Sequence, residues 1–576
     1  MSKISLSNFF YVIAITFPLV ILYEIFVYGS HVPVHDYWDN MTLMLRYEGK
    51  VDLLSLQNEH IQAVARIIYY VNMHLFDGHD LPLKLVSFVF AALQIPMIYS
   101  IARKYITCDF KRSLCFFIIT SYCFTPFAIE NFIAGMSGTV WLSTNFFVIA
   151  AFYSFYNRNQ RPYLYKLTFV MSCIFASLSH STGFFILPSL AVAYLLAYRP
   201  SLKVSLAILS TSCILVLAYI LFFFEVPEQH VETYNMGLLD NLLPKILSIV
   251  LMSGMAISYV IFAPILACVI LYNLARTSLR VHKIKEASEK ENKIFFIAIA
   301  VYSLAFISSC SFARYDIVFM GFVDDSRYQS LPALLLIASF IMFIKNVKIQ
   351  PDSKKYIISL CVLALTAVTF GRGFAKVELF RSIHEISNLN SYSLLLNESF
   401  VFSVYNKPEF KAPVSEKKDF IEKNSVKYLR NYKNVPFNES YWNKCDRAIK
   451  EGIESDVQNS ESMFNWGYSK LDSPGWDHSF VQIYMLENKT DTECVLITDA
   501  QNQIVGAGFP SKTFTHEYVK VADEYHKYPL LRAFIVARDD DFYKDYYVIS
   551  YNQRTGKAIR YNLSAEPLAE VEDKGR

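Results

Sequence analysis

The feature that most constrains this chain is a succession of long apolar runs that fills the first 370 residues and then stops. Each run is long enough to cross ~30 Å of hydrocarbon. The composition is 53% hydrophobic and 16% aromatic with only 18% charged residues, which lies well off the average of soluble domains. The sequence therefore predicts a polytopic α-helical membrane protein followed by a water-soluble C-terminal part.

We expect about eleven membrane-spanning helices. They cover residues 9–28, 83–102, 113–128, 136–156, 167–179, 183–198, 204–224, 246–273, 294–312, 328–344 and 356–371. Two of the divisions depend on short polar breaks, Glu130-Asn131 and the stretch 179–183. Without these breaks each pair of runs would form one over-long helix.

The positions of Lys and Arg decide both divisions, because cytoplasmic loops of membrane proteins are enriched in these residues. With eleven spans, every basic cluster falls on the same side of the membrane. These clusters are at 103–112, 158–166, 199–203, 276–293 and 345–355. The pattern predicts a cytoplasmic N-terminus and an exported C-terminal part. The first run also lacks an Ala-x-Ala-like cleavage site, so we expect a membrane anchor there and no cleaved signal peptide.

The first exported loop, residues 29–82, carries the most polar side chains of interest. Asp36 and Asp39 follow the first span and would share one face of a helical turn at the membrane surface. Glu59 and His60 precede an amphipathic segment, residues 61–76, with helical spacing of its apolar residues. Taken singly, Asp36 is better explained as a helix cap and His60 as a solvated interfacial residue. Taken together, the polar residues of the loop favour a chemical role.

A second exported region lies between the ninth and tenth spans and contains Arg314, Arg327 and Tyr328. A guanidinium at the start of a helix offers paired donors to a phosphate group, although interfacial snorkelling or pairing with a neighbouring aspartate is the alternative. Glu130 and His180 are further pocket candidates, because both are polar groups at helix ends on the same predicted face. The acidic loop at 225–245 is better explained as solvated.

The C-terminal part divides into a mixed helical connection at 372–460 and a β-rich domain at 461–576. Short apolar or alternating runs at 479–484, 494–498, 531–537 and 546–551 predict strands, and a small exported β-sandwich or α+β domain is the expected fold. Cys445 and Cys494 lie in this part, where an oxidising compartment permits a disulfide; the spacing does not decide whether it forms.

The layout resembles the GT-C superfamily of membrane glycosyltransferases. The resemblance is carried by Asp36 and Asp39 after the first span, the large first loop, about eleven spans and the exported C-terminal domain. Asn58-Glu59-His60 and Ser326-Arg327-Tyr328 also look like short motifs of bacterial membrane proteins of this kind.

The resemblance implies transfer of a sugar from a polyprenyl-phosphate donor to a glycan or glycolipid acceptor, such as lipopolysaccharide O-antigen, on the periplasmic side of the bacterial inner membrane. It implies that Asp36 or Asp39 is the base, with Asp36 preferred because it lies nearer the span. Family members often carry Asp-Glu or Asp-x-Asp there, so the base assignment, divalent-metal dependence and stereochemistry stay open.

Other classes are less well supported by the sequence. The net charge of +3 gives no reason to expect nucleic acid as a partner, and the cysteines show no metal-ligand spacing. No P-loop, dinucleotide fingerprint or nucleophile motif occurs. An O-antigen polymerase or ligase remains an alternative, as does a flippase for lipid-linked sugars, although the chain shows no internal repeat and few charges inside its spans.

Overall fold

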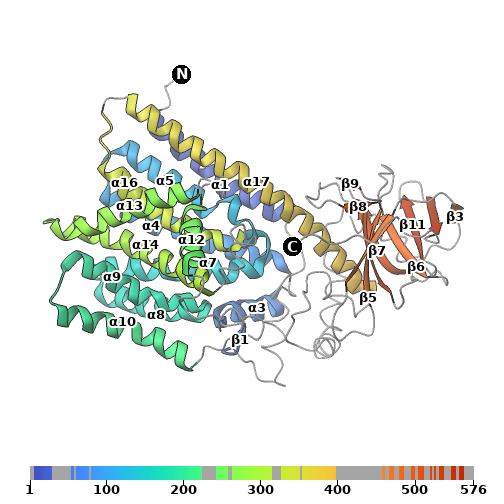
Figure 1. Cartoon of the computed structure of the whole chain (residues 1–576), viewed down its shortest axis with the longest axis horizontal. Coiled ribbons are helices and arrows are strands. Elements are labelled where there is room, and N and C mark those ends of the chain that lie inside the picture. Colours follow the sequence, from blue (N-terminus) through green and yellow to red (C-terminus); the bar gives the residue numbers. More distant parts are fainter. Residues whose placement is uncertain are drawn as a thin grey trace. The chain divides into compact units, whose positions relative to one another are not determined.

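The structure is a computed structural model of the full chain. It describes residues 5–28, 53–57, 60–76, 79–222, 242–256, 263–313, 326–350 and 353–396, and after these the strands β3–β12 alone. Two compact units are present, and the division between them falls inside the last helix, between Val377 and Glu378. The first unit is helical, and Figure 1 shows its helices packed side by side as a bundle.

The helical elements of the described chain have the following bounds. They are α1 Leu6–Tyr28, α3 Ala63–Leu75, α4 Asp80–Tyr105, α5 Asp109–Cys123, η1 Pro126–Ala128, α6 Glu130–Ile133, α7 Gly135–Tyr156, α8 Pro162–Ser179, η2 Ser181–Phe185, α9 Ile186–Tyr198, α10 Leu202–Phe222, α12 Leu242–Gly254, α13 Ala263–Arg280, η4 Val281–Lys283, α14 Ala287–Ala313, η6 Ser326–Gln329, α16 Ser330–Asn346 and α17 Ser353–Leu396. A two-stranded pair, β1 Leu56–Gln57 and β2 His60–Ile61, precedes α3.

Among the described residues, nine helices are long and apolar enough to cross a membrane, which indicates a multi-pass membrane protein. Eight of them correspond to predicted spans, and the ninth, Ala263–Lys283, overlaps only the end of the predicted span at 246–273. The predicted spans at 113–128 and 167–179 coincide with α5 and α8, which fall outside the nine. With 15 residues, α5 is ~22 Å long, shorter than the ~30 Å of hydrocarbon.

Both polar breaks predicted from the sequence separate helices. Thr125 accepts a hydrogen bond from the backbone N–H of Phe127 and so caps η1, and Pro126 begins that turn. The segment from Thr125 to Ala134 therefore divides α5 from α7. At the other break, His180 ends α8 and caps η2. The amphipathic segment after His60 forms α3, as its spacing predicts.

The predicted span at 246–273 is wrong. Its residues belong to two helices, α12 and α13, which pack against each other. A Cβ on Gly254 would lie 1.9 Å from the carbonyl oxygen of Ala263, so glycine permits this close approach. The 13 residues of α12 extend only ~20 Å, whereas α13 with η4 spans 21 residues and is one of the nine long helices.

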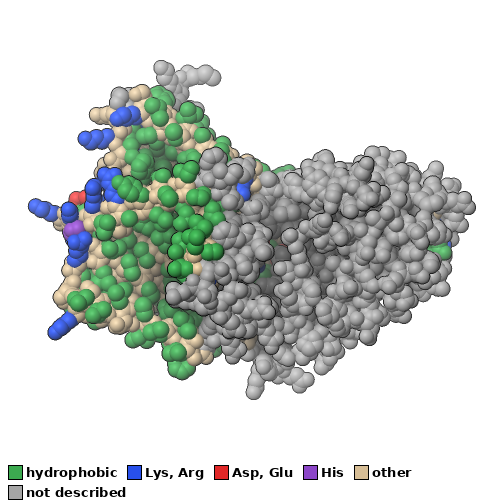
Figure 2. All heavy atoms as spheres, viewed as in Figure 1, with side chains coloured by type: hydrophobic (Ala, Val, Ile, Leu, Met, Phe, Trp, Pro, Cys, Tyr) green, Lys and Arg blue, Asp and Glu red, His purple; other side chains and the backbone are tan. Residues whose placement is uncertain are grey.

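The predicted basic clusters meet at one end of the bundle, which we call the basic end and define by Lys104, Lys111, Arg158, Lys290 and Lys345. The Nζ of Lys111 donates to the carbonyl of Lys345 at 3.0 Å, and the Nζ of Lys345 donates to the carbonyl of Tyr105 at 2.9 Å. Lys104 lies over the ring of Tyr156, 5.1 Å from its centre. Figure 2 shows Lys and Arg side chains gathered there, while the flanks are largely hydrophobic.

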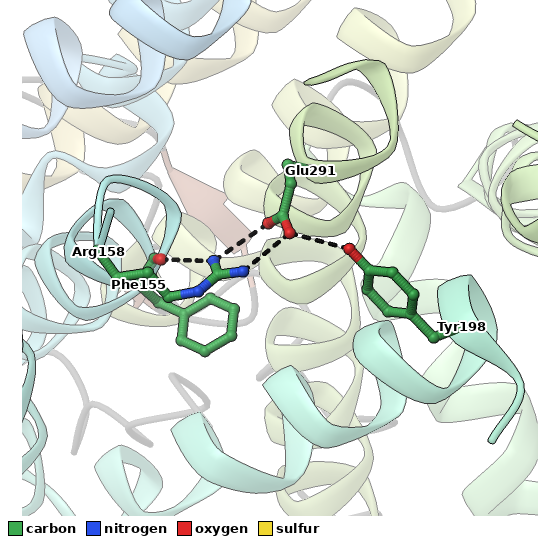
Figure 3. A network of polar contacts seen from close by, with 4 residues as sticks. All are labelled: Phe155, Arg158, Tyr198 and Glu291. Atoms are coloured by element: carbon green, nitrogen blue, oxygen red, sulfur yellow. Dashed lines mark hydrogen bonds and ion pairs between the residues drawn. The ribbon is translucent and has the colours of Figure 1, made fainter. Parts of the chain in front are cut away.

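An ion pair joins three helix ends at the basic end (Figure 3). Arg158 binds the carboxylate of Glu291 with two hydrogen bonds of 2.9 and 3.2 Å, and the hydroxyl of Tyr198 donates to the same carboxylate at 3.0 Å. The hydrogen bonds that Arg158 donates to Glu291 raise the pKa of Arg158 above its usual value. The ends of α7 and α9 are therefore tied to the beginning of α14, although these segments are far apart in the sequence.

The strands after α17 have bounds as follows: β3 Val457–Ser460, β4 Trp466–Leu471, β5 Ser479–Met485, β6 Cys494–Asp499, β7 Ile504–Pro510, β8 Val519–Val521, β9 Glu524–His526, β10 Leu531–Ala537, β11 Tyr546–Asn552 and β12 Lys557–Asn562. Eight of them pair in the order β3-β12-β11-β6-β7-β10-β5-β4, antiparallel except for β12 with β3. The strands β5, β6, β10 and β11 lie on the four runs singled out in the sequence. The helix α17 continues without a break through the segment after residue 371.

Candidate functional site

Residues from four distant parts of the chain form a stacked cluster in the helical unit, which we define as His60, Trp141, His180, Arg327 and Tyr328. The rings of His60 and His180 lie 3.9 Å apart between centroids. Trp141 contacts His180 at 4.5 Å and Tyr328 at 5.1 Å, the latter edge to face. The guanidinium of Arg327 lies over the ring of Tyr328 at 5.2 Å. The cluster thus runs continuously from His60 to Arg327.

His180 is held by the turn between α8 and η2. Its backbone is extended where α8 ends, and its Nδ1 accepts a hydrogen bond from the backbone N–H of Thr182 at 3.3 Å. The turn packs tightly on α8, because a Cβ on Gly183 would lie 2.2 Å from the backbone of Ala176. With Nδ1 accepting, the proton of the neutral imidazole sits on Nε2. His180 is only 2% exposed.

His60 approaches this turn from the first loop. It lies on β2, which pairs with β1 and leads directly into α3. The Nδ1 of His60 is 2.6 Å from the hydroxyl of Ser181, 121 residues away in the sequence. The loop before His60 is held by the buried Arg66, which donates to the carbonyl and the hydroxyl of Ser55. His60 is half-buried, so one side of the histidine pair is accessible.

Arg327 and Tyr328 are placed by the short helix α6. The side chain of Asn131 donates to the backbone carbonyl of Arg327 at 2.9 Å and accepts from the hydroxyl of Ser137 at 3.0 Å. Asn131 is fully buried, and its neighbour Glu130 is 6% exposed. This explains the polar break: Asn131 connects α6, the start of α7 and the turn before α16.

The stacked cluster and the basic end lie at opposite ends of the bundle. Both α7 and α16 begin near the cluster, at Gly135 and Ser330, and finish at the basic end. The 22 residues of α7 correspond to ~33 Å, about the thickness of a bilayer core.

A buried ion pair next to α7 was missed by the sequence analysis. Asp80 and Lys84 are fully buried at the start of α4, with 2.9 Å between Oδ2 and Nζ. The backbone N–H of Gly135 points to the same carboxylate oxygen at 3.5 Å. The signal was present as an Asp and a Lys four residues apart, but charges at the beginning of an apolar run are usually interfacial. Trp141 was missed because nothing distinguishes it from other aromatic residues of a span.

Five residues singled out in the sequence therefore come together or lie beside the cluster: Glu130, His60, His180, Arg327 and Tyr328. Asp36, Asp39, Glu59 and Arg314 lie outside the described residues. Within the described ranges, no group of three or more His, Cys, Asp or Glu side chains is arranged to hold a metal ion. The described site accordingly offers imidazole, guanidinium, phenol and indole groups, with the buried carboxylates of Glu130 and Asp80 beside the same end of α7.

Comparison of the chain with known proteins identifies no relative. No protein-family model matches the chain. No characterised protein and no solved structure is significantly similar to it.

Proposed function

We propose that this protein is a membrane glycosyltransferase of the GT-C type, which transfers one sugar from a polyprenyl-phosphate donor to a cell-envelope glycan such as lipopolysaccharide O-antigen. The observation that carries the proposal is the stacked cluster. His60, His180, Arg327 and Tyr328, each a site candidate from the sequence, come together at the end of the bundle opposite the basic end. The bundle between these ends has about the length of a membrane core. A lipid-linked donor requires such a place, because its phosphate lies at the interface while its tail stays in the bilayer.

The proposed orientation follows from the basic end, which we assign to the cytoplasm of a bacterial inner membrane. Helix α1 begins there, since Phe10 packs against Phe110 in the first turn of α5. Helix α17 begins beside the basic end and reaches η1 at the other end, where Arg372 lies over Phe127. The stacked cluster then faces the periplasm. So does the chain from residue 372 onward, which we propose to form the connection 372–460, beginning with the last part of α17, and an exported β-rich domain at 461–576.

The proposed chemistry assigns roles by charge. An acceptor hydroxyl attacks the anomeric carbon and loses its proton to a base, while the bond between that carbon and the phosphate oxygen breaks and its electron pair leaves with polyprenyl phosphate. Arg327 is half-buried and stabilises the departing phosphate. The base is Asp36 or Asp39, as the family resemblance implies. His60 and His180 position the hydroxyl of the acceptor, and no metal is assigned.

The test is mass analysis of surface glycans from cells that lack the gene and from cells complemented with variants. We expect loss of the gene to remove one sugar per acceptor. At least one of the variants D36N and D39N should fail to restore it. H180Q and R327Q should also fail, with R327Q lowering transfer by about 10²–10³-fold. The controls are H282Q in η4 and R280Q at the end of α13, which change the same residue types at the basic end of the bundle. Both should restore the glycan fully. Identical glycans with and without the gene would remove the proposal.

An O-antigen polymerase or ligase is the second candidate, and the composition of the cluster favours it. Enzymes of that kind rely on arginine and histidine side chains, which predominate in the described site. They transfer a whole oligosaccharide, so the same experiment separates the two functions. A change in the distribution of chain lengths, with no single-sugar difference, would favour the polymerase.

A further inference from the structure

A lateral apolar groove that shares no residue with the stacked cluster lies between α13, α16 and α17, with a contribution from α5. Its volume is about 360 Å³, within the range of ligand pockets of about 300–1,000 Å³. Of the residues that line it, Val269, Phe343 and Ile357 are each more than half exposed, so the groove opens sideways to the surroundings of the bundle. In a membrane, these surroundings are lipid chains.

The wall of the groove is well defined. The side-chain amide of Asn273 on α13 donates to the backbone carbonyl and the hydroxyl of Ser339 on α16, at 2.9 and 3.0 Å. These bonds join the two helices at the groove and satisfy its main polar groups. The remaining lining is almost wholly aliphatic and aromatic. Such a surface accepts a hydrocarbon chain and offers nothing to a sugar or a peptide.

One end of the groove reaches the basic end. On α16 its lining includes Phe343 and Ile344, which directly precede Lys345. On α17 it begins at Ile357 and Ile358, and Lys354 precedes them by three and four residues on the same helix face. Helical side chains incline toward the N-terminus, so the amino group of Lys354 extends beyond the groove toward the membrane surface. Lys348, exposed between the two helices, adds a third positive charge.

We propose that this groove binds an acidic glycerophospholipid of the leaflet at the basic end, with one acyl chain in the groove and the headgroup phosphate held by Lys348 and Lys354. The apolar lining selects a hydrocarbon chain, and the lysines select an anionic headgroup over a zwitterionic one. The inference requires only that the bundle crosses a membrane, and it does not depend on the glycosyltransferase proposal.

The first experiment measures lipid retention by native mass spectrometry. The delipidated full-length protein is mixed with phosphatidylglycerol or phosphatidylcholine that carry the same acyl chains. Wild type should retain phosphatidylglycerol preferentially, and each of K348Q and K354Q should weaken that retention about fivefold. C361W, which fills the groove from an exposed lining position, should weaken retention of both lipids. The matched controls are K203Q and L217W on α10, which should change neither.

A second measurement avoids any effect of substitution on folding. Cys361 lines the groove, whereas Cys268 is an exposed free cysteine of α13 outside the lining. Phosphatidylglycerol should slow the alkylation of Cys361 by N-ethylmaleimide more than phosphatidylcholine does, and neither lipid should change the alkylation of Cys268. Equal retention of the two phospholipids by wild type, or equal protection of both cysteines, would overturn the proposal.

Discussion

The buried pair of Asp80 and Lys84 allows a quantitative test of the packing between α4 and α7. Both side chains are fully buried, and their charged atoms are 2.9 Å apart. At an effective dielectric constant of ~20, the attraction at this distance is ~6 kcal/mol, most of which offsets the cost of removing the two charges from water. The net contribution of the pair is therefore small, but the loss of either partner alone is costly.

We expect D80N and K84M each to lower the free energy of unfolding by about 3–5 kcal/mol, because each leaves one buried charge without its counterion. The double variant should lose only about 1 kcal/mol, mainly from the acidic group in the first turn of α4. The coupling energy in the double-mutant cycle is then at least about 5 kcal/mol. Replacement of both charges is mild because no uncompensated charge remains.

The assay is reversible unfolding from dodecyl maltoside into dodecyl sulfate, followed by helical circular dichroism. The pair Glu289 and Lys293 on α14 is the matched control, with the same spacing of four residues but a distance of 3.5 Å and partial exposure. Its coupling should stay below about 0.5 kcal/mol. Additive effects of D80N and K84M, or a coupling no larger than that of the control pair, would refute this account of the buried pair.

Three further predictions concern the elements that hold the two ends of the bundle. G138A should lower the free energy of unfolding by more than about 2 kcal/mol in the same assay, because the new Cβ would lie 1.8 Å from the carbonyl oxygen of Asn131. The control G371A, which has open space at its Cβ, should be neutral or stabilising by up to about 1 kcal/mol. G183A should displace His180 and abolish glycan transfer in complemented cells; full activity of this variant would contradict the role of the turn. E291Q should lower the free energy of unfolding by about 1 kcal/mol, because the amide of glutamine replaces the charged acceptor of the two hydrogen bonds from Arg158. Equal stability of E291Q and wild type would show that the network is not stabilising.

The sequence alone determined the helical class, most helix positions and the grouping of basic loops. These are local properties, because the length of an apolar run and the nearest Lys or Arg are written in consecutive residues. Local pattern was misleading at 246–273, where continuous apolarity conceals the break between α12 and α13. There Gly254 allows a close approach to Ala263, and this approach is a property of packing that composition does not reveal.

The chemical type of each side chain was enough to identify five site candidates in the sequence, His60, Glu130, His180, Arg327 and Tyr328. Only the tertiary structure decided that they lie close together. The sequence separates His60 from the partner of its Nδ1 by 121 residues, and no periodicity relates them. Their contact depends on where α8 ends, on the lack of a side chain at Gly183 and on the amide of Asn131 that holds the turn before α16. Apolar runs specify helices one at a time, whereas the contacts between helix ends arise from the packing of the whole bundle.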